Sequence, residues 1–244
     1  MQTLIVIPTY NEARNLPELA RQLFALPLAD VHVLVVDDNS PDGTANVAED
    51  LNGPYPGRVH VLRRKAKQGL GRAYVAGFKE ALRLAPTYVV QMDADLSHPP
   101  SSVPDLLAAL KDADVAVGSR YIRGGGAAQK WGLGRKLISQ GGDAYVRMVL
   151  GLPVHDTKSG FKAFRRQVLE AIDLDAVTSH GYIVQAEIMY RCYKMGYRIR
   201  EVPFVFYERR AGKSKMSIGI ITEALWRSVW LRLHGKRIRP RAAA

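Results

Sequence analysis

Asp93 and Asp95 stand one residue apart, directly after an apolar run at residues 88–92. Side chains two positions apart on an extended chain point the same way, so both carboxylates can face the crevice beyond a buried strand. Two negative charges this close repel each other unless a cation lies beside them. Mg²⁺ and Mn²⁺ bind to a few carboxylates and complete their shell with water and substrate phosphates. The pair therefore predicts a divalent metal ion that holds a diphosphate.

Two other structures share this aspartate spacing. An EF-hand loop requires Asp or Asn at its fifth position and glycine at its sixth. The chain has Ser97 and His98 there, which excludes that loop. A helix N-cap is also compatible with the spacing, because Pro99 and Pro100 and then a helical pattern follow. The residues alone leave this second alternative open.

Polar side chains also follow three other expected strands, in the segments 8–12, 37–40 and 118–120. Open α/β sheets bind ligands beyond the carboxyl ends of their strands, so these segments predict one shared site. Tyr10 offers a ring on which a base can stack, and Glu12 offers an acceptor for the N–H groups of that base. Glu12 in a first helical turn is also explained by the helix dipole alone.

Two further segments suit phosphate binding. Gly69-Leu70-Gly71 superficially resembles a phosphate-binding loop, but it lacks the third glycine of a dinucleotide fingerprint and the Gly-Lys-Ser/Thr of a P-loop. Close helix packing is the alternative explanation for its glycines. The segment 208–215 carries four cations that can grip phosphate oxygens, although a solvated basic loop has the same composition.

The elements that position these residues alternate in type along the first half. Strands are expected at residues 3–7, 31–36, 59–63, 88–92 and 115–118, and helices at 11–25, 42–51, 70–84 and 103–111. The strand segments are rich in Val, Ile and Leu throughout, as in strands buried on both faces. The alternation predicts right-handed βαβ units and a mainly parallel sheet.

The second half follows a different pattern. A mobile glycine-rich loop is expected at residues 121–134, a short element at 160–164 and a strand at 198–202, with helices at 135–150, 184–195 and 217–234. No internal repeat or low-complexity linker is visible. The simplest organisation is one domain at residues 1–215 followed by a helix and a basic tail at 216–244. Within that domain the pattern distinguishes a first half at residues 1–120 from a second half at residues 121–215.

Bulk composition limits the possible partners. The 244 residues carry a net charge of +12, which favours a polyanion such as nucleic acid or an anionic membrane surface. No nucleic-acid recognition motif is present, so we expect no nucleic-acid partner. A single cysteine fits a reducing compartment, and no run approaches the ~20 apolar residues that span a bilayer. We therefore expect a cytoplasmic protein without a transmembrane helix.

The final helix favours a membrane surface over a membrane span. Its apolar positions include two tryptophans, Trp226 and Trp230, and basic residues lie beside and after them. Interfacial tryptophan with neighbouring cations is typical of a helix that lies on a membrane. Packing of the helix on the catalytic domain explains the same pattern equally well.

Taken together, the chain resembles the family-2 glycosyltransferases, and among them the polyprenyl-phosphate (dolichyl-phosphate) mannose synthases. The matching segments occur in the expected order over most of the chain, at residues 7–12, 35–42, 69–71, 92–100, 118–121, 131–139, 159–161 and 208–215. The resemblance implies a GT-A (Rossmann-like) α/β fold whose mainly parallel sheet is flanked by helices, with C-terminal amphipathic helices at the membrane interface. It also implies transfer of mannose from GDP-mannose to a polyprenyl or dolichyl phosphate, with inversion and with Mg²⁺ or Mn²⁺.

The resemblance assigns roles to particular residues. The nucleoside is expected to contact Pro8, Tyr10, Glu12, Val36 and Asp38. The diphosphate and its metal are expected at Asp93, Ala94 and Asp95, with Asp95 the strongest ligand and Ser97 a third. The phosphates of donor and acceptor are expected to contact Arg120, Arg209 and Lys215, and the acceptor phosphate also Arg135 and Ser139. The expected catalytic residues are Asp93, Asp95, Arg120 and Arg209.

The chain departs from the family pattern at two positions. Ser97 stands where the family often has glutamine, so the third metal contact is lost or mediated by water. Lys158 stands where threonine is common. Related enzymes that use UDP-glucose or a UDP-aminoarabinose sugar share several motifs, so a UDP-sugar donor is the alternative. A sugar-nucleotide pyrophosphorylase is disfavoured, because it requires a glycine-rich basic loop after the first strand.

Overall fold

A seven-stranded sheet forms the centre of the protein, in the order β3-β2-β1-β4-β7-β5-β8. The computed structural model describes residues 2–129, 133–179, 181–207, 218–235 and 238, without the side chains of 133–137 and 218–221. The strands are β1 (Thr3–Thr9), β2 (Val31–Asp37), β3 (Val59–Arg63), β4 (Tyr88–Gln91), β5 (Val115–Ser119), β7 (Lys162–Arg165) and β8 (Ile199–Pro203). All pairings in the sheet are parallel except those of β7, which runs antiparallel between β4 and β5.

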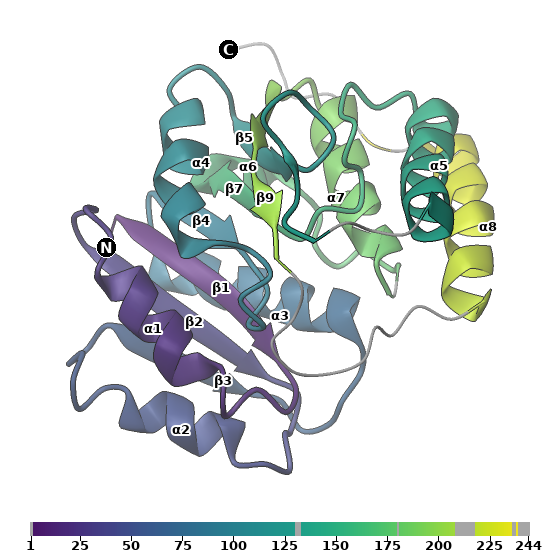
Figure 1. Ribbon diagram of the computed structural model, residues 1–244. Coiled ribbons are helices and arrows are strands. Elements are labelled where there is room, and N and C mark those ends of the chain that lie inside the picture. Colours follow the sequence, from purple (N-terminus) through teal and green to yellow (C-terminus); the bar gives the residue numbers. More distant parts are fainter. Residues whose placement is uncertain (1, 130–132, 180, 208–217, 236–237, 239–244) are drawn as a thin grey trace.

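Helices cover both faces of the sheet (Figure 1). One face packs against α1 (Leu16–Phe24), α2 (Thr44–Asp50) and α4 (Val103–Ala109), and the other against α3 (Leu70–Leu84), α6 (Arg166–Ala171) and α7 (Ile183–Lys194). Successive strand residues alternate between the two faces. Leu4 packs in the core under α3, α6 and α7, and Ile5 packs in the core under α1, α2 and α4. Because both faces are buried, the strands are apolar throughout, as the sequence predicted.

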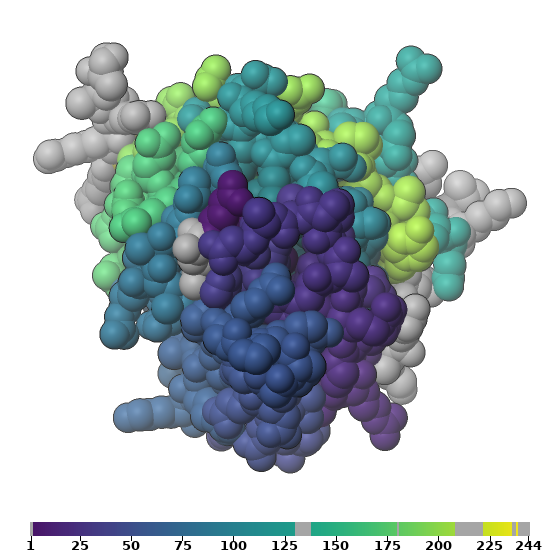
Figure 2. All heavy atoms as spheres, turned by 90° about the vertical axis from the view of Figure 1, so that its left-hand side faces the viewer, coloured from purple at the N-terminus to yellow at the C-terminus, as the bar shows by residue number. Residues whose placement is uncertain are grey.

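Two long helices lie outside this layer. The helix α5 (Leu133–Leu150) and the helix α8 (Ile218–His234) lie side by side at the right of Figure 1, and α8 also packs against α7. From the side shown in Figure 2, the purple and blue N-terminal segments form the lower part of the molecule and teal and green segments the upper part. In the part of the chain that the structure describes, no helix is both long and apolar enough to cross a membrane.

The expected elements are largely confirmed, with local differences. The first helix begins at Leu16 instead of residue 11, because Asn11 has a left-handed backbone (φ 63°) and residues 12–15 form a turn before Pro17. The expected loop at 121–134 contains a short strand, β6 (Gly126–Ala127), which pairs with β9 (Val205–Phe206). The basic segment 208–215 lies outside the described residues.

The strand order creates the site. The chain continues from β1 to β2 on one side, while β4 lies on the other side of β1, so the carboxyl ends of β1 and β4 form the switch point at which open α/β sheets bind ligands. Because β7 is antiparallel, its beginning lies at this same edge. Residues 159–161 therefore lie beside the aspartates that follow β4, and Gly160 approaches the Asp93 carboxylate.

Candidate active site

The loop after β4 carries the aspartate pair and is folded back on itself. The backbone N–H of Asp93 donates to Nδ1 of His98 (3.0 Å), and the N–H of Ser97 donates to Oδ1 of Asp95 (3.1 Å). The His98 ring stacks on Phe161, with centroids 5.0 Å apart and planes 7° apart. Burial lowers the pKa of His98, which favours the neutral ring. These contacts fix the loop against the start of β7.

The Asp93 carboxylate is held on one side and open on another. The hydroxyl of Tyr74, a fully buried residue of α3, donates to Oδ1 of Asp93 (2.9 Å). Burial and the neighbouring Asp93 raise the pKa of Tyr74 well above its ordinary value, so the phenol stays a donor. A Cβ at Gly160 would lie 3.3 Å from Oδ1 and 3.5 Å from Oδ2 of Asp93. The absence of a side chain at Gly160 therefore leaves room beside the carboxylate.

These groups fit a hard divalent cation that shares its shell with substrate. Among the described residues, no group of three or more His, Cys, Asp or Glu side chains is placed to hold a metal. An ion beside Asp93 and Asp95 would take further ligands from phosphate and water, as Mg²⁺ does with nucleotides. Ser97 is buried next to Asp95, and its carbonyl accepts a hydrogen bond from the N–H of Tyr207 (3.1 Å). Its role as a ligand stays a prediction.

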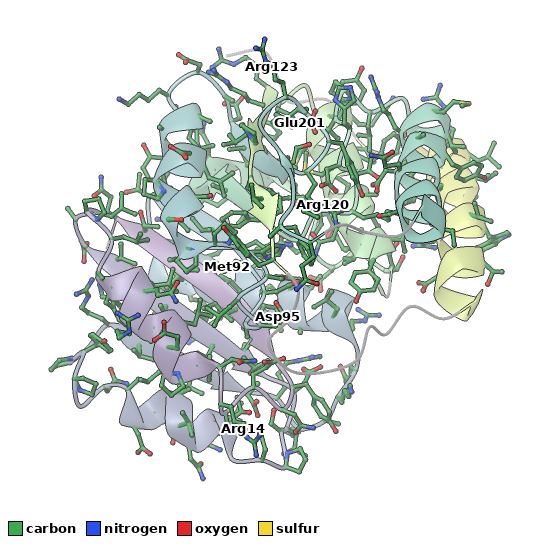
Figure 3. The ribbon with its side chains drawn as sticks, viewed as in Figure 1. Arg14, Met92, Asp95, Arg120, Arg123 and Glu201 are labelled. Atoms are coloured by element: carbon green, nitrogen blue, oxygen red, sulfur yellow. The ribbon has the colours of Figure 1, made fainter. Side chains whose placement is uncertain are left out.

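Arg120 lies at the same end of the sheet, above Asp95 in Figure 3. Its Nε and Nη2 atoms donate to the two carboxylate oxygens of Asp156 (both 2.7 Å), and its backbone N–H donates to Oδ2 (3.0 Å). Asp156 is fully buried, and its own N–H donates to Glu201. Burial lowers the pKa of Arg120, but Asp156 outweighs this effect and the pKa is raised. The guanidinium is therefore a fixed positive charge at this edge of the sheet.

The residues expected to contact the nucleoside lie at the ends of β1 and β2. Pro8 and Val36 are partners in the strand register, and the Val36 side chain is buried in the core. Asp38 is buried and forms an ion pair with Arg64. Burial raises the pKa of Asp38 although Arg64 acts in the opposite direction.

The ring of Tyr10 and the carboxylate of Glu12 also lie at this end. The ammonium of Lys67 lies 3.5 Å from the centroid of the Tyr10 ring, so one face of that ring already carries a cation. Glu12 accepts a hydrogen bond from the Asn15 side chain (2.7 Å). Segment 64–68 thus covers the end of the site where a base is expected.

The acceptor residues are only partly described. Ser139 of α5 hydrogen-bonds to the hydroxyl of Tyr121 (2.7 Å), and burial raises the pKa of Tyr121 to about 12. This contact places Ser139 close to the residue that follows Arg120. The side chain of Arg135 lies outside the described residues, as do Arg209 and Lys215.

Comparison with known proteins identifies the family. Residues 4–173 match the sequence profile of glycosyl transferase family 2. The chain belongs to this family. It is 45% identical over 242 residues to the polyprenol monophosphomannose synthase of Mycolicibacterium smegmatis, covering 98% of this chain and 90% of that protein. It is 47% identical over 226 residues to the undecaprenyl-phosphate mannosyltransferase of Micrococcus luteus, covering 92% and 91%.

Solved structures agree on the fold. Glucosyl-3-phosphoglycerate synthase from Mycobacterium tuberculosis, in complex with Mn²⁺, UDP and phosphoglyceric acid, superposes with a TM-score of 0.69 at 20% identity, covering 96% of this chain and 78% of that one. At this identity the likeness concerns the fold alone. This glycosyltransferase therefore has the expected GT-A-like α/β fold, with a mostly parallel sheet flanked by helices.

Several residues of the site carried no signal in the sequence. Tyr74 follows the helical pattern of a core residue. Asp156 begins the family segment that continues to Phe161, but that segment does not mark it as the partner of Arg120. Both become visible only when α3 and segment 155–161 meet β4 and β5. At Gly71 the structure favours close packing, because a Cβ there would collide with the carbonyl of Ser179.

Proposed function

We propose that this glycosyltransferase transfers mannose from GDP-mannose to a polyprenyl (dolichyl-type) monophosphate and forms a β-linked polyprenyl-phosphate mannose. The names of the two relatives support the mannose and the polyprenyl phosphate. The observation that carries the proposal is the position of the Asp93–Asp95 loop and the Arg120 guanidinium at one end of the sheet, beside the carboxyl ends of β1 and β4. An anionic donor and an anionic acceptor can meet there.

The carboxylates at the nucleoside end favour guanine as the base. Guanine presents two adjacent N–H donors, N1–H and the 2-amino group, which a carboxylate accepts as a pair. Uracil presents a single N–H between two carbonyls, so it matches a carboxylate less well. Glu12 and Asp38, with Tyr10, Pro8 and the backbone at Val36, are the residues we propose for the nucleoside. A UDP-sugar remains the alternative donor.

The diphosphate lies, in this proposal, at Asp93, Ala94 and Asp95. Bound Mg²⁺ or Mn²⁺ would stabilise the charge that grows on the leaving diphosphate. Asp93 and Asp95 would hold that ion, and Ser97 would contact it directly or through water. Tyr74 and His98 keep the loop in place while the donor binds. Solved enzymes of this fold have been crystallised with Mn²⁺, which supports the choice of metal.

The acceptor needs no general base. A phosphate monoester has a second pKa of about 6, so it is largely dianionic at neutral pH and is already a nucleophile. The protein must align its oxygen with the anomeric carbon and the leaving group, and in-line attack on an α-linked donor gives the β-product. Arg120, Arg135, Arg209 and Lys215 would offset the repulsion between the phosphates, with Ser139 as a further acceptor contact.

The outer face of α5 and α8 supports peripheral membrane binding. Leu231 and Ser228 of α8 are buried, whereas Trp226 is 65% and Leu233 67% exposed. Met148 of α5 is also exposed. The helix thus packs on the protein with one face and presents apolar side chains with the other. We propose that this face rests on an anionic membrane, on the cytoplasmic side where the lone, buried Cys192 stays reduced.

A transfer assay tests the function directly. Purified protein is incubated with a short polyprenyl phosphate and either radiolabelled GDP-mannose or radiolabelled UDP-glucose, and the lipid product is counted. We expect transfer from GDP-mannose. Transfer from UDP-glucose alone would replace the proposed donor, and transfer from neither, in the presence of MgCl₂ or MnCl₂, would overturn the function.

A further inference from the structure

Lys162 is a fully buried lysine in the middle of the sheet. It is the first residue of β7, opposite Gln91 of β4 and Val117 of β5. Its ammonium donates to the carbonyl of Ser159 and to Oε1 of Gln185 (2.6 Å). Both partners are neutral amide oxygens, and within the described residues no carboxylate pairs with it directly. A buried ammonium without a paired charge is costly, so its presence calls for a compensating interaction.

A series of polar side chains leads from this ammonium to the loop that carries Asp93 and Asp95. The same Oε1 of Gln185 accepts from Nε2 of Gln91 (2.5 Å), Gln91 influences the pKa of the Tyr74 hydroxyl, and that hydroxyl donates to Asp93. Lys162, Gln185, Gln91 and Tyr74 are buried, and Asp93 is half-buried. Lys162 and Asp93 are therefore the two charged ends of one internal polar network.

The network can accommodate either protonation state of the lysine. With the ammonium charged, Gln185 presents its oxygen to both Lys162 and Gln91. The oxygen and nitrogen ends of an amide have nearly the same shape, so both glutamine side chains could rotate by half a turn. The NH₂ group of Gln185 would then donate one N–H to a neutral Lys162 amine and the other to the oxygen of Gln91. In the structure, Oε1 of Gln91 and Nε2 of Gln185 have no hydrogen-bond partner among the described residues.

Three titratable groups from different parts of the chain influence the pKa of Lys162. Burial lowers its pKa to about 7, against the opposing influence of Asp156, Cys192 and Asp93. Burial raises the pKa of the Cys192 thiol to about 12, so Cys192 is neutral. Asp156 is already engaged by Arg120. Of these three groups, Asp93 is therefore the one whose negative charge would be offset by a cation that binds at the proposed metal site.

We propose that Lys162 is the internal counter-charge of the aspartate loop, and that it gives up its proton when a divalent cation binds beside Asp93 and Asp95. This inference rests on the proposed metal site. In the metal-free protein the ammonium balances Asp93. A bound dication neutralises the negative charge of Asp93 and repels the Lys162 ammonium. One N–H bond of the ammonium then breaks, the proton passes to the buffer and the electron pair stays on nitrogen. Metal affinity then falls as pH decreases, because protons compete with the cation.

Proton release on addition of MnCl₂ alone tests the proposal. Protein at pH 7 is titrated by calorimetry in PIPES and in Tris, whose ionisation heats differ, so the difference gives the protons released per ion. We expect a substantial fraction of one proton from the native protein and none from K162M, whose neutral side chain has a similar length. At pH 6, K162M should bind Mn²⁺ about tenfold more tightly than the native protein, because it has no proton to displace. K162R, which stays charged, should release no proton and bind more weakly.

The matched control is K79M. Lys79 is a partly exposed lysine of α3 that pairs with Asp175, away from the network. It should release protons like the native protein. Binding of Mn²⁺ by the native protein without proton release, or unchanged release in K162M, would overturn this inference and leave the metal site intact. A native protein that binds no Mn²⁺, either alone or in the presence of GDP, would overturn both. The native measurement alone decides the matter if the Lys162 variants do not fold.

Discussion

Asp156 binds the side chain and the backbone of Arg120 at once: its carboxylate accepts two guanidinium hydrogen bonds of 2.7 Å and one backbone N–H at 3.0 Å. The bidentate pair fixes the direction of the guanidinium. It also fixes the backbone at the point where β5 leaves the sheet. Arg120 is thus already oriented at this edge of the sheet, and a phosphate that bound to it, as proposed, would not have to order it.

D156A is expected to reduce both stability and activity. Removing one partner of a buried pair leaves the other charge uncompensated, which typically destabilises a protein by about 3–5 kcal/mol. Urea unfolding followed by circular dichroism measures this. The control is E170A, which breaks the exposed Arg166–Glu170 pair of α6 and should change stability by less than about 1 kcal/mol. Equal effects of the two substitutions would show that Asp156 does not hold Arg120 as proposed.

D95A is expected to lower kcat by about 10²–10³, the range seen when one stabilising group for developing charge is removed. The effect should act through the metal, so transfer is assayed over a series of MnCl₂ concentrations. Asp105, an exposed residue in the first turn of α4, provides the control D105A. Near-normal turnover of D95A without added metal would refute metal binding by this loop.

G160A tests the space beside Asp93. The added methyl group would lie 3.3 Å and 3.5 Å from the two carboxylate oxygens and 3.3 Å from Cε1 of His98, so these neighbours would have to move by a few tenths of an ångström. We expect weaker Mn²⁺ binding and a higher MnCl₂ requirement, with little loss of folding stability. G141A is the control: Gly141 lies on exposed α5 with nothing within 4 Å of a Cβ, so alanine should favour the helix. Unaltered Mn²⁺ affinity in G160A would place the metal elsewhere.

W226S/L233S is expected to weaken membrane binding while the protein stays folded. Both side chains are exposed on α8, so their removal leaves the packing against α5 and α7 in place. Flotation with vesicles that contain anionic lipid measures binding, and soluble substrate analogues check that the site survives. Y193S, at an exposed tyrosine of α7, controls for general loss of apolar surface. Equal flotation of native protein and W226S/L233S would exclude this face as the membrane contact.

The sequence predicts what depends on local pattern. The helix at residues 70–84 has the predicted bounds, because its apolar period and its flanking residues are unambiguous. The aspartate pair is equally visible, since it follows an apolar strand directly. The antiparallel insertion of β7 is not visible, because strand order depends on packing between distant segments. Tyr74, Asp156 and Lys162 gain their roles only from that order, so no local signal reveals them.

K162M should change the pH dependence of stability in a defined direction. The pKa of Lys162 is lowered from 10.5 to about 7, so between these values the unfolded chain binds more protons than the folded one. Stability of the native protein therefore rises with pH in this window, by up to about 1.4 kcal/mol per pH unit, and the contribution is lost as pH falls through 7. K162M lacks this term. Relative to the native protein it should be most stabilised near pH 6, and the difference should shrink steadily towards pH 10. Urea midpoints across this range measure it, with K79M as control, and parallel curves for native protein and K162M would show that Lys162 titrates normally.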